Sequence, residues 1–483
     1  MDFPAIRQRH GALALAAFFV TAMCGGAQAA VLDLVRSAPA GSWIHASQNA
    51  VSSVWTPGPD QNDFTVMGGE MNRIIYAWSS FAWDSNRSDM IIYGGGHANY
   101  GGNDVYTWNG SNLLWERSSL PSRVDLTLVG GYFYGFAADG AMNAPQSAHT
   151  YDNTVFLKTS DRYLTFGGAA FNNGGQYFKA NGDGTVSQTG PYVFTPNLAD
   201  PFKVGGTTGS GVNPARLGSQ AWQNRDTNTT APPGQKPISF VDGFSDSTVV
   251  GGKDVVYVGG TQFGTPLDLY RYTINDINNP TADTWQLVGT ATIGTSEGNA
   301  AGALDIHRNV FVRTGETGLP FIYWDTSQSG AGNVDHAIFP TDLTGGLMPT
   351  DTSGYGLIYD QARHRFIFWK GGTDVFALNE PAGAIGVSGW TVTKLNVNLP
   401  GGPGPLNTIQ ILGKWQYATD LDAFVGLQGA TTGDVWIFKP EGWIDPAAAV
   451  PEPQTAILSL LGLLVVGSRV HARRRSLVKQ ASV

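Results

Sequence analysis

The sequence has almost no cysteine and little charge. Its 483 residues include a single cysteine, Cys24, and charged side chains make up 14% of the chain. Because we expect the segment that contains Cys24 to be removed, the remaining chain has no disulfide, although it folds in an oxidising compartment. A stable fold must then depend on a large core, and roughly 420 residues with abundant Trp, Tyr and Phe can supply one.

Common metal and cofactor motifs are also absent. There is no Cys-x-x-Cys, no His-Glu-x-x-His and no Gly-Lys-Ser/Thr phosphate loop. The stretch 181–185 lacks the alternating ligands of an EF-hand and indicates a turn. Amphipathic helix patterns of about 10–15 residues are absent as well, which argues against an α/β barrel. The sequence therefore predicts an all-β protein with no metal and no cofactor.

Positive charge is scarce in the part of the chain that we expect to be exported. Removing residues 1–29 and 451–483 leaves 22 basic and 36 acidic side chains, a net charge of −14. A field of this sign disfavours nucleic acid and other polyanions, unless a local basic patch overrides it. Disorder is excluded because the chain has many aromatics, and 63 glycines among short β-rich runs indicate many turns.

Residues 1–29 have the parts of a secretory signal peptide in the usual order. Arg7 and Arg9 precede an apolar run at 12–20, and small residues then lead to Ala29. Cleavage is expected after Ala29, since the apolar core is too short to remain comfortably as a membrane span. The alternative is a buried helix of the folded domain.

The last segment, residues 446–483, carries a Pro-Glu-Pro motif, an apolar run at 456–467 and a basic cluster. The motif and the main basic residues are Pro451, Glu452, Pro453, Arg473, Arg474 and Arg475. Arginines hold this end in the cytoplasm and leave the domain outside. The segment resembles the PEP-CTERM sorting signal of Gram-negative bacteria that make extracellular polysaccharide. The resemblance implies a single hydrophobic helix in the membrane before processing, an exosortase as partner, and a final place on the cell surface, outer membrane or extracellular matrix.

A repeated unit fills the region between the two ends. It consists of a short strand, an aspartate-led turn, a second apolar strand that ends in glycines, and later strands with aromatics. Its clearest copies begin at residues 78, 302 and 354, with turn residues Asp84, Asp305 and Asp360. The aspartates suit the first position of a turn, and paired glycines permit positive φ. A period of about 50–60 residues with about four strands per unit predicts a β-propeller over residues 30–445.

The repeat predicts a ring of six or seven blades. Six copies are recognisable, and strand material at 42–77 either closes the ring by pairing near Val435–Phe438 or forms part of a seventh blade. The order of glycine pair, Tyr and Trp resembles the kelch repeat and the central domain of galactose oxidase. That family's copper site needs a tyrosine cross-linked to a cysteine, so copper radical oxidase activity is not expected here. The main alternative fold is a large β-sandwich array.

Two histidine–tyrosine pairs are candidates for chemistry. His97 and Tyr100 lie in a glycine-rich loop, and His149 and Tyr151 lie on a segment expected to be an innermost strand. Such a pair, with Arg216 and Arg225 from the long stretch 195–239 neutralising a carboxylate, could carry out β-elimination on a uronic-acid polysaccharide. The structural interpretation is that His97 ties the loop by hydrogen bonds and that His149 lines the channel.

The function expected from these observations is binding of extracellular polysaccharide or another matrix component by an exported surface propeller. A polysaccharide lyase is the first alternative, and a structural matrix protein without a small ligand is the second. Convergence of His, Tyr and Arg in one pocket would favour the lyase, whereas scattered positions would favour binding.

Overall fold

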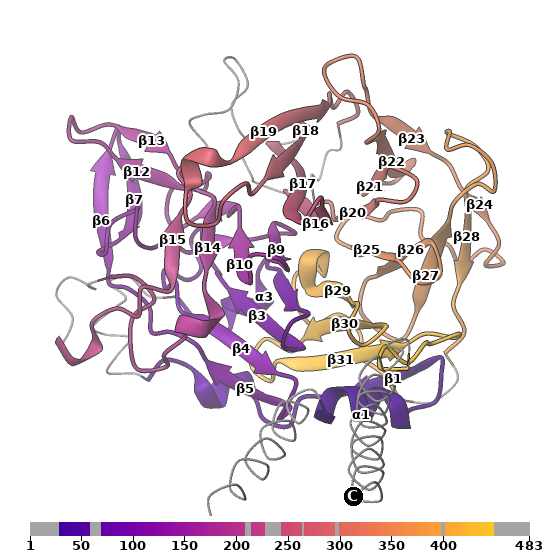
Figure 1. The fold of residues 1–483 in the computed structure, drawn as a ribbon, viewed down its shortest axis with the longest axis horizontal. Coiled ribbons are helices and arrows are strands. Elements are labelled where there is room, and N and C mark those ends of the chain that lie inside the picture. Colours follow the sequence, from indigo (N-terminus) through magenta and orange to yellow (C-terminus); the bar gives the residue numbers. More distant parts are fainter. Residues whose placement is uncertain are drawn as a thin grey trace, which may run out of the picture. The chain divides into compact units, whose positions relative to one another are not determined.

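The computed structural model describes residues 29–57, 69–207, 214–227, 243–262, 265–294, 299–397 and 401–448. One compact unit of the chain ends at Trp443. In this unit, sheets of four or five strands follow one another around a common centre (Figure 1). The described residues contain six such sheets, so the protein is an all-β, six-bladed β-propeller and the smaller of the two predicted ring sizes is present.

The blades are numbered in chain order, and their strands are given from the innermost outward. Blade 1 contains β2 (Phe81–Asp84), β3 (Asp89–Tyr93), β4 (Val105–Asn109) and β5 (Leu114–Arg117). Blade 2 contains β9 (Thr154–Leu157), β10 (Arg162–Thr165), β14 (Tyr192–Phe194) and β15 (Trp222–Asn224). Blade 3 contains β16 (Phe244–Val250), β17 (Lys253–Gln262), β18 (Thr265–Thr273) and β19 (Thr284–Gly289).

The second half of the ring repeats this arrangement. Blade 4 contains β20 (Gly302–Asp305), β21 (Val310–Glu316), β22 (Leu319–Asp325) and β23 (His336–Ile338). Blade 5 contains β25 (Gly356–Asp360), β26 (Arg365–Trp369), β27 (Val375–Asn379), β28 (Thr391–Lys394) and β24 (Thr341–Asp342). Blade 6 contains β29 (Trp415–Ala418), β30 (Ala423–Gln428), β31 (Asp434–Lys439) and β1 (Ser42–His45). Successive innermost strands contact each other around the whole ring, from β2 through β29 and back to β2.

Shorter elements lie outside the six blades. The described helices are α1 (Ala29–Ser37), α3 (Arg73–Tyr76) and 3-10 turns at Val51–Val54, Pro196–Leu198, Pro214–Arg216, Pro280–Ala282 and Leu412–Lys414. The strand pairs are β6 (Val124–Val129) with β7 (Tyr132–Ala137), β8 (Ala148–His149) with β11 (Ala169–Ala170), and β12 (Phe178–Ala180) with β13 (Val186–Gln188). The stretch 195–239, expected to be irregular, supplies β15 of blade 2.

The aspartate-led turns occupy equivalent corners of the ring, as the repeat predicts. Asp84, Asp305 and Asp360 are each the last residue of an innermost strand. Oδ1 of Asp84 accepts the backbone N–H two residues on at 2.9 Å, and Oδ1 of Asp305 does the same at 2.8 Å. In blade 5, Oδ1 of Asp360 accepts the backbone N–H of Arg363, three residues on, at 3.2 Å. A short acidic side chain thus fixes the turn that leads back into the second strand.

The same turns join neighbouring blades through an arginine. Arg87, three residues after Asp84, donates from Nη1 to Asp84 Oδ2 at 2.7 Å. Its Nη2 donates to Oδ2 of Asp161, in the turn of blade 2, at 2.6 Å. The pattern Asp-x-x-Arg is therefore a unit that bridges two blades, and only its aspartate was predicted from the sequence.

The bridge recurs in the second half of the ring. Arg363 donates to its own Asp360 at 2.7 Å and to Asp422 of blade 6 at 2.5 Å. Arg308 of blade 4 reaches Glu380 of blade 5 at 3.1 Å. Because Asp360 and Asp422 are almost entirely buried, these arginines offset charges that would otherwise be costly in the interior.

The ring is closed by pairing the N-terminal strand with the C-terminal ones. β1 runs antiparallel to β31, with Ser42 opposite Lys439 and His45 opposite Trp436. In Figure 1, β1 in indigo lies beside β31 in yellow. This confirms that strand material from residue 42 closes the sixth blade and does not form a seventh. Closure leaves no open edge between the first and last blades.

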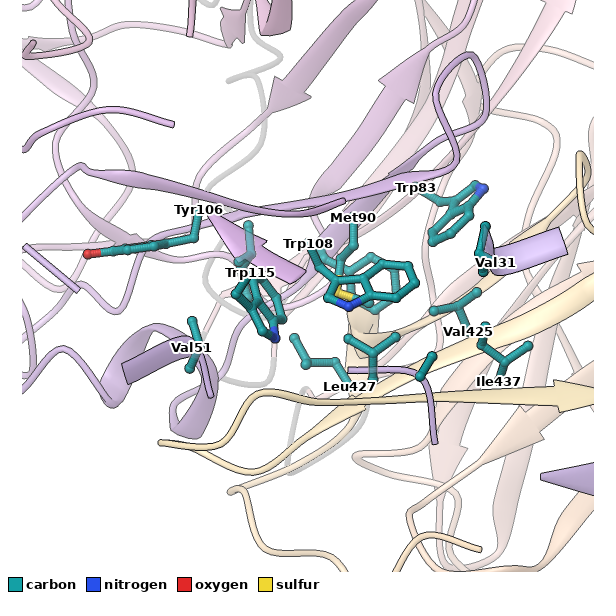
Figure 2. Packing of buried hydrophobic residues seen from close by; sticks show 14 of the residues in the cluster. Val31, Val51, Trp83, Met90, Tyr106, Trp108, Trp115, Val425, Leu427 and Ile437 are labelled. Carbon is teal, nitrogen blue, oxygen red and sulfur yellow. The ribbon is translucent and has the colours of Figure 1, made fainter. Parts of the chain in front are cut away.

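Aromatic side chains fill the spaces between blades. Trp108 and Trp115 of blade 1 pack with Val425, Leu427 and Ile437 of blade 6 in one buried cluster (Figure 2). These two tryptophans thus lie between neighbouring blades. Dispersion and burial, without disulfides, hold successive blades together.

Several predictions fall on residues that the structure does not describe. The signal peptide up to residue 28, the Pro451-Glu452-Pro453 motif, the hydrophobic helix and the Arg473–Arg475 cluster all lie outside the described residues. Among the described residues, no helix is long and apolar enough to cross a membrane.

Candidate functional site

The loop face of the ring, where the innermost strands begin, carries one group of predicted residues. His97 lies in the connection between β3 and β4, and its backbone N–H donates to Ala169 O at 3.0 Å. His149 is the last residue of β8, just before innermost strand β9 and not on it as expected. The connection packs against this segment, because a Cβ added to Gly96 would lie 2.2 Å from Ala148 Cα. Only glycine permits this approach.

Aromatic and imidazole rings gather at this point. The ring centroids of His97 and His149 are 5.8 Å apart, and those of His149 and Tyr151 are 6.1 Å apart. Trp78 lies 5.1 Å from His149, also between centroids. Asn99 Nδ2 donates to His149 Nε2 at 2.8 Å. Burial lowers the pKa of His149 to about 3, so its imidazole is neutral and accepts this bond.

Tyr100 does not belong to this group. Its hydroxyl donates to Asp104 Oδ1 at 2.9 Å, and the side chain is only 2% exposed. Asp104 also accepts hydrogen bonds from Tyr106 at 2.6 Å and Thr56 at 3.0 Å. Burial raises the pKa of Tyr100 well above its usual value. The structure therefore places Tyr100 in a buried network under the loop and does not pair it with His97.

The two predicted arginines differ in their surroundings. Arg225 is buried and pairs with Asp283 of blade 3 at 2.7 Å, with both side chains fully excluded from solvent. It also donates to Asp276 O at 2.9 Å, so it bridges blades 2 and 3 and is not available to neutralise a substrate carboxylate. Arg216 lies on the 3-10 turn Pro214–Arg216 and is half-buried.

Lys414 is a buried group on the loop face that the sequence did not reveal. Its side chain is fully buried, and Nζ donates to Ala77 O at 3.1 Å. Burial lowers the pKa of Lys414 to about 7. Its charge in turn helps to lower the pKa of His149. Nothing in its flanking sequence marks it, because burial of a lysine depends on distant blades.

Residues just before the innermost strands meet across the axis near the loop face. Asp152 Oδ2 of blade 2 accepts the N–H of Gly302 of blade 4 at 2.8 Å. Gly413, before blade 6, packs so closely that an added Cβ would lie 2.7 Å from Asp152 Oδ1 and 2.3 Å from Ser80 Cβ. The contacts of Asp152 join blade 2 to blades 4 and 6, which are not its neighbours, so these segments fill the centre of the ring on this side.

A cavity of about 670 Å³ occupies the centre on the opposite side, where the aspartate-led turns lie. We call this the axial cavity. Its walls come from innermost strands and turns of blades 1, 2, 3, 5 and 6, and its lining residues with hydroxyl or amide side chains are Ser85, Asn86, Thr159, Ser247, Thr248, Tyr359, Gln361, Gln416, Tyr417 and Thr419. This volume is within the range of small-ligand sites.

The aromatic side chains of the axial cavity present little ring surface. Trp83 is 6% exposed and Tyr359 is 2% exposed, because innermost-strand side chains mostly point toward neighbouring blades. Tyr417 is half-buried, and its hydroxyl donates to Asp422 Oδ1 at 2.6 Å. The amides of Gln361 and Gln416 have no hydrogen bond to another described residue, and both line the cavity. They are available for a ligand.

Asp246 is the acidic group of the axial cavity on innermost strand β16. Its Oδ2 accepts the N–H of Leu304 at 2.8 Å, and its Oδ1 accepts the N–H of Ser247 at 2.7 Å. Burial raises the pKa of Asp246 to about 7. A carboxyl group that changes charge near neutral pH can both donate and accept hydrogen bonds to a ligand. Within the described part of the chain, no three His, Cys, Asp or Glu side chains form a group that could hold a metal ion.

Comparisons with known proteins leave the family open. No protein-family model matches the chain, and no curated protein matches it. Among solved structures, it is similar to a luciferin-regenerating enzyme, with 8% identity, coverage of 76% of this chain and 92% of the other, and a TM-score of 0.33. The Dos1 propeller has 10% identity, coverage of 86% and 96%, and a TM-score of 0.31.

A third similar structure is an auxiliary nutrient binding protein from Bacteroides thetaiotaomicron. Its identity is 9%, the coverage is 72% of this chain and 93% of that one, and the TM-score is 0.27. Likenesses at this level carry no conclusion about activity. The assignment of the propeller depends on the strand pairing of the chain itself, and function has to be argued from its sites.

Proposed function

We propose that this protein is an exported surface propeller that binds saccharide, with the axial cavity as the binding site. The observation that carries the proposal is the lining of that cavity. Hydroxyl and amide groups from five blades converge on about 670 Å³, and the amides of Gln361 and Gln416 lack partners among the described residues. Gln361 is exposed and Gln416 is half-buried, and ligands rich in hydroxyl groups suit such a surface, since a ligand that displaces water from a polar group has to replace its hydrogen bond.

Calorimetric titration of the purified protein with oligosaccharides tests the proposal. Gln416→Ala and Gln361→Ala each remove one free amide, and each is expected to weaken binding by about fivefold, the typical worth of one neutral hydrogen bond. Gln328→Ala is the matched control, because Gln328 is exposed on a turn of blade 4 and bonds to Asp325. Equal affinities for all three variants and the parent protein would place any binding outside the axial cavity.

A polysaccharide lyase is the second candidate. The meeting of His97, His149 and Tyr151 on the loop face favours it, although Tyr100 and Arg225 are committed elsewhere. Incubation with acidic polysaccharides, followed by the ultraviolet absorbance of unsaturated uronates, is the assay. A signal that His149→Ala abolishes would support the lyase, and no signal across the panel would remove it for those substrates.

Export and sorting form part of the proposal. The support is the sequence order of a signal peptide at 1–29 and a PEP-CTERM-like segment at 446–483. We expect replacement of Pro451, Glu452 and Pro453 by alanine to leave the protein in the inner membrane. Cell fractionation with immunodetection measures this, and unchanged release would contradict processing by an exosortase.

A further inference from the structure

Charge is distributed unevenly in the axial cavity. Lys158 is exposed on the turn after β9, at the outer end of the cavity. Asp246 lies on an innermost strand, and the third charged lining residue is Asp254. The carboxylate of Asp254 already accepts the N–H groups of Thr159 at 2.9 Å and Ser160 at 2.7 Å. Asp254 is also only 2% exposed, whereas Asp246 is half-buried, so Asp246 is the acidic group that a ligand can reach.

Asp246 has no ion pair with another described residue. Its two oxygens accept one backbone N–H each, from Leu304 and Ser247, so each oxygen keeps room for a second donor. Another acid, Asp152, interacts with it from outside the cavity lining; burial raises the pKa of Asp152 well above its usual value, and the charge of Asp246 adds to the rise. No ion pair with a described residue therefore neutralises Asp246 in the cavity.

The nearby arginines of the turns do not change this balance. Arg87 is held between Asp84 and Asp161, and Arg363 donates to two aspartates of blades 5 and 6. A ligand carboxylate next to Asp246 would meet a like charge in a poorly solvated place, which is unfavourable. A hydroxyl group or an ammonium group would instead donate a charge-assisted hydrogen bond.

On the basis of the proposed function, we infer that the axial cavity selects saccharides by charge at Asp246. Amino sugars bind through an ammonium group that donates a hydrogen bond to the Asp246 carboxylate. Neutral sugars bind more weakly through a hydroxyl group, and uronic acids are rejected. This identifies the ligand class as amino or neutral polysaccharide, in contrast to the uronate substrates that a lyase would require.

Three matched probes test this selection. They are tetramers of β-1,4-linked glucosamine, glucose and glucuronic acid, which share the backbone. Each sugar of the first carries an ammonium group, each sugar of the third carries a carboxylate, and the second is neutral. Titration at about pH 7, where both Asp246 and the sugar ammonium groups are partly charged, should give the order glucosamine, glucose, glucuronic acid, with about tenfold between the first two. Glucuronic acid binding as tightly as glucose would overturn the inference while leaving saccharide binding intact. Absence of binding by all three would overturn the proposed function as well.

A pair of variants locates the effect. Asp246→Asn removes the charge and keeps the shape, so the glucosamine tetramer should lose about tenfold in affinity and approach the glucose tetramer. Asp254→Asn is the matched control, because that carboxylate lines the same cavity and also accepts two backbone N–H groups, but is only 2% exposed. A ranking that Asp246→Asn leaves unchanged, or that Asp254→Asn alters equally, would refute selection at Asp246. The ranking measured on the unaltered protein remains decisive if either variant fails to fold.

Discussion

The arginine bridges between blades predict a defined loss of stability when one is removed. Arg87→Met keeps the aliphatic stem and deletes the guanidinium that joins Asp84 and Asp161. Hydrogen bonding to Arg87 lowers the pKa of Asp161 from 3.8 to about 2. That shift corresponds to about 2 kcal/mol, which we reduce to about 1 kcal/mol because the side chain is partly open to solvent.

The second contribution comes from the buried partner. Asp84 is fully excluded from solvent and would keep only its backbone hydrogen bonds, which adds about 1–3 kcal/mol. The total loss of about 2–4 kcal/mol corresponds to a fall in Tm of about 2–4 °C for a unit of this size. Arg162→Met is the control, because Arg162 bonds through Nη1 only to the carbonyls of Ser160 and Asp161.

The pH dependence gives the sharper test. The folded-state pKa of Asp161 is depressed, so its stabilisation is present above about pH 4 and is lost as the pH falls toward 2. Burial raises the pKa of Asp84, so this carboxylate also takes up a proton on acidification, which removes its unpaired charge in the variant. The difference in Tm between the parent protein and Arg87→Met, measured by calorimetry, should therefore shrink between pH 6 and pH 3. A difference below about 0.5 °C at neutral pH, or one that grows on acidification, would refute this reasoning.

Three further predictions follow from the packing and the cavity. Trp43 lies at the ring closure, with the ring centroids of two other tryptophans 5.3 and 5.8 Å away. Trp43→Ala should lower the free energy of unfolding, measured with denaturant, by about 3–5 kcal/mol. A loss below about 1 kcal/mol would contradict this role in packing. Gly168→Ala would place a Cβ 1.7 Å from His149 O, so we expect a reduced soluble yield and a lower Tm. A Tm equal to that of the parent protein would show that the segment can shift. Because burial raises the pKa of Asp246 to about 7, affinity for the glucosamine tetramer should rise from about pH 5.5 to 7 as the carboxyl ionises, before the sugar ammonium groups lose their protons. Asp246→Asn should abolish the rise, and a flat profile in the parent protein would oppose this.

The sequence by itself determined the local chemistry of each blade. Asp84, Asp305 and Asp360 form their turns through bonds to backbone only two or three residues away, and that spacing is visible in the chain. The glycine pairs behave likewise, since Gly94 and Gly95 adopt φ values of 123° and 99° directly after the second strand. Features that depend on near neighbours could therefore be predicted without a structure.

Tertiary structure alone decided which of the candidate residues meet. The grouping of His97 with His149, the commitment of Tyr100 to Asp104 and the burial of Arg225 against Asp283 depend on how blades pack side by side. The axial cavity also could not be predicted, because its lining comes from five blades at separations of up to several hundred residues. The physical reason is that the burial and desolvation of a side chain depend on the assembled ring, whereas the geometry of a turn depends on the few residues of the turn itself.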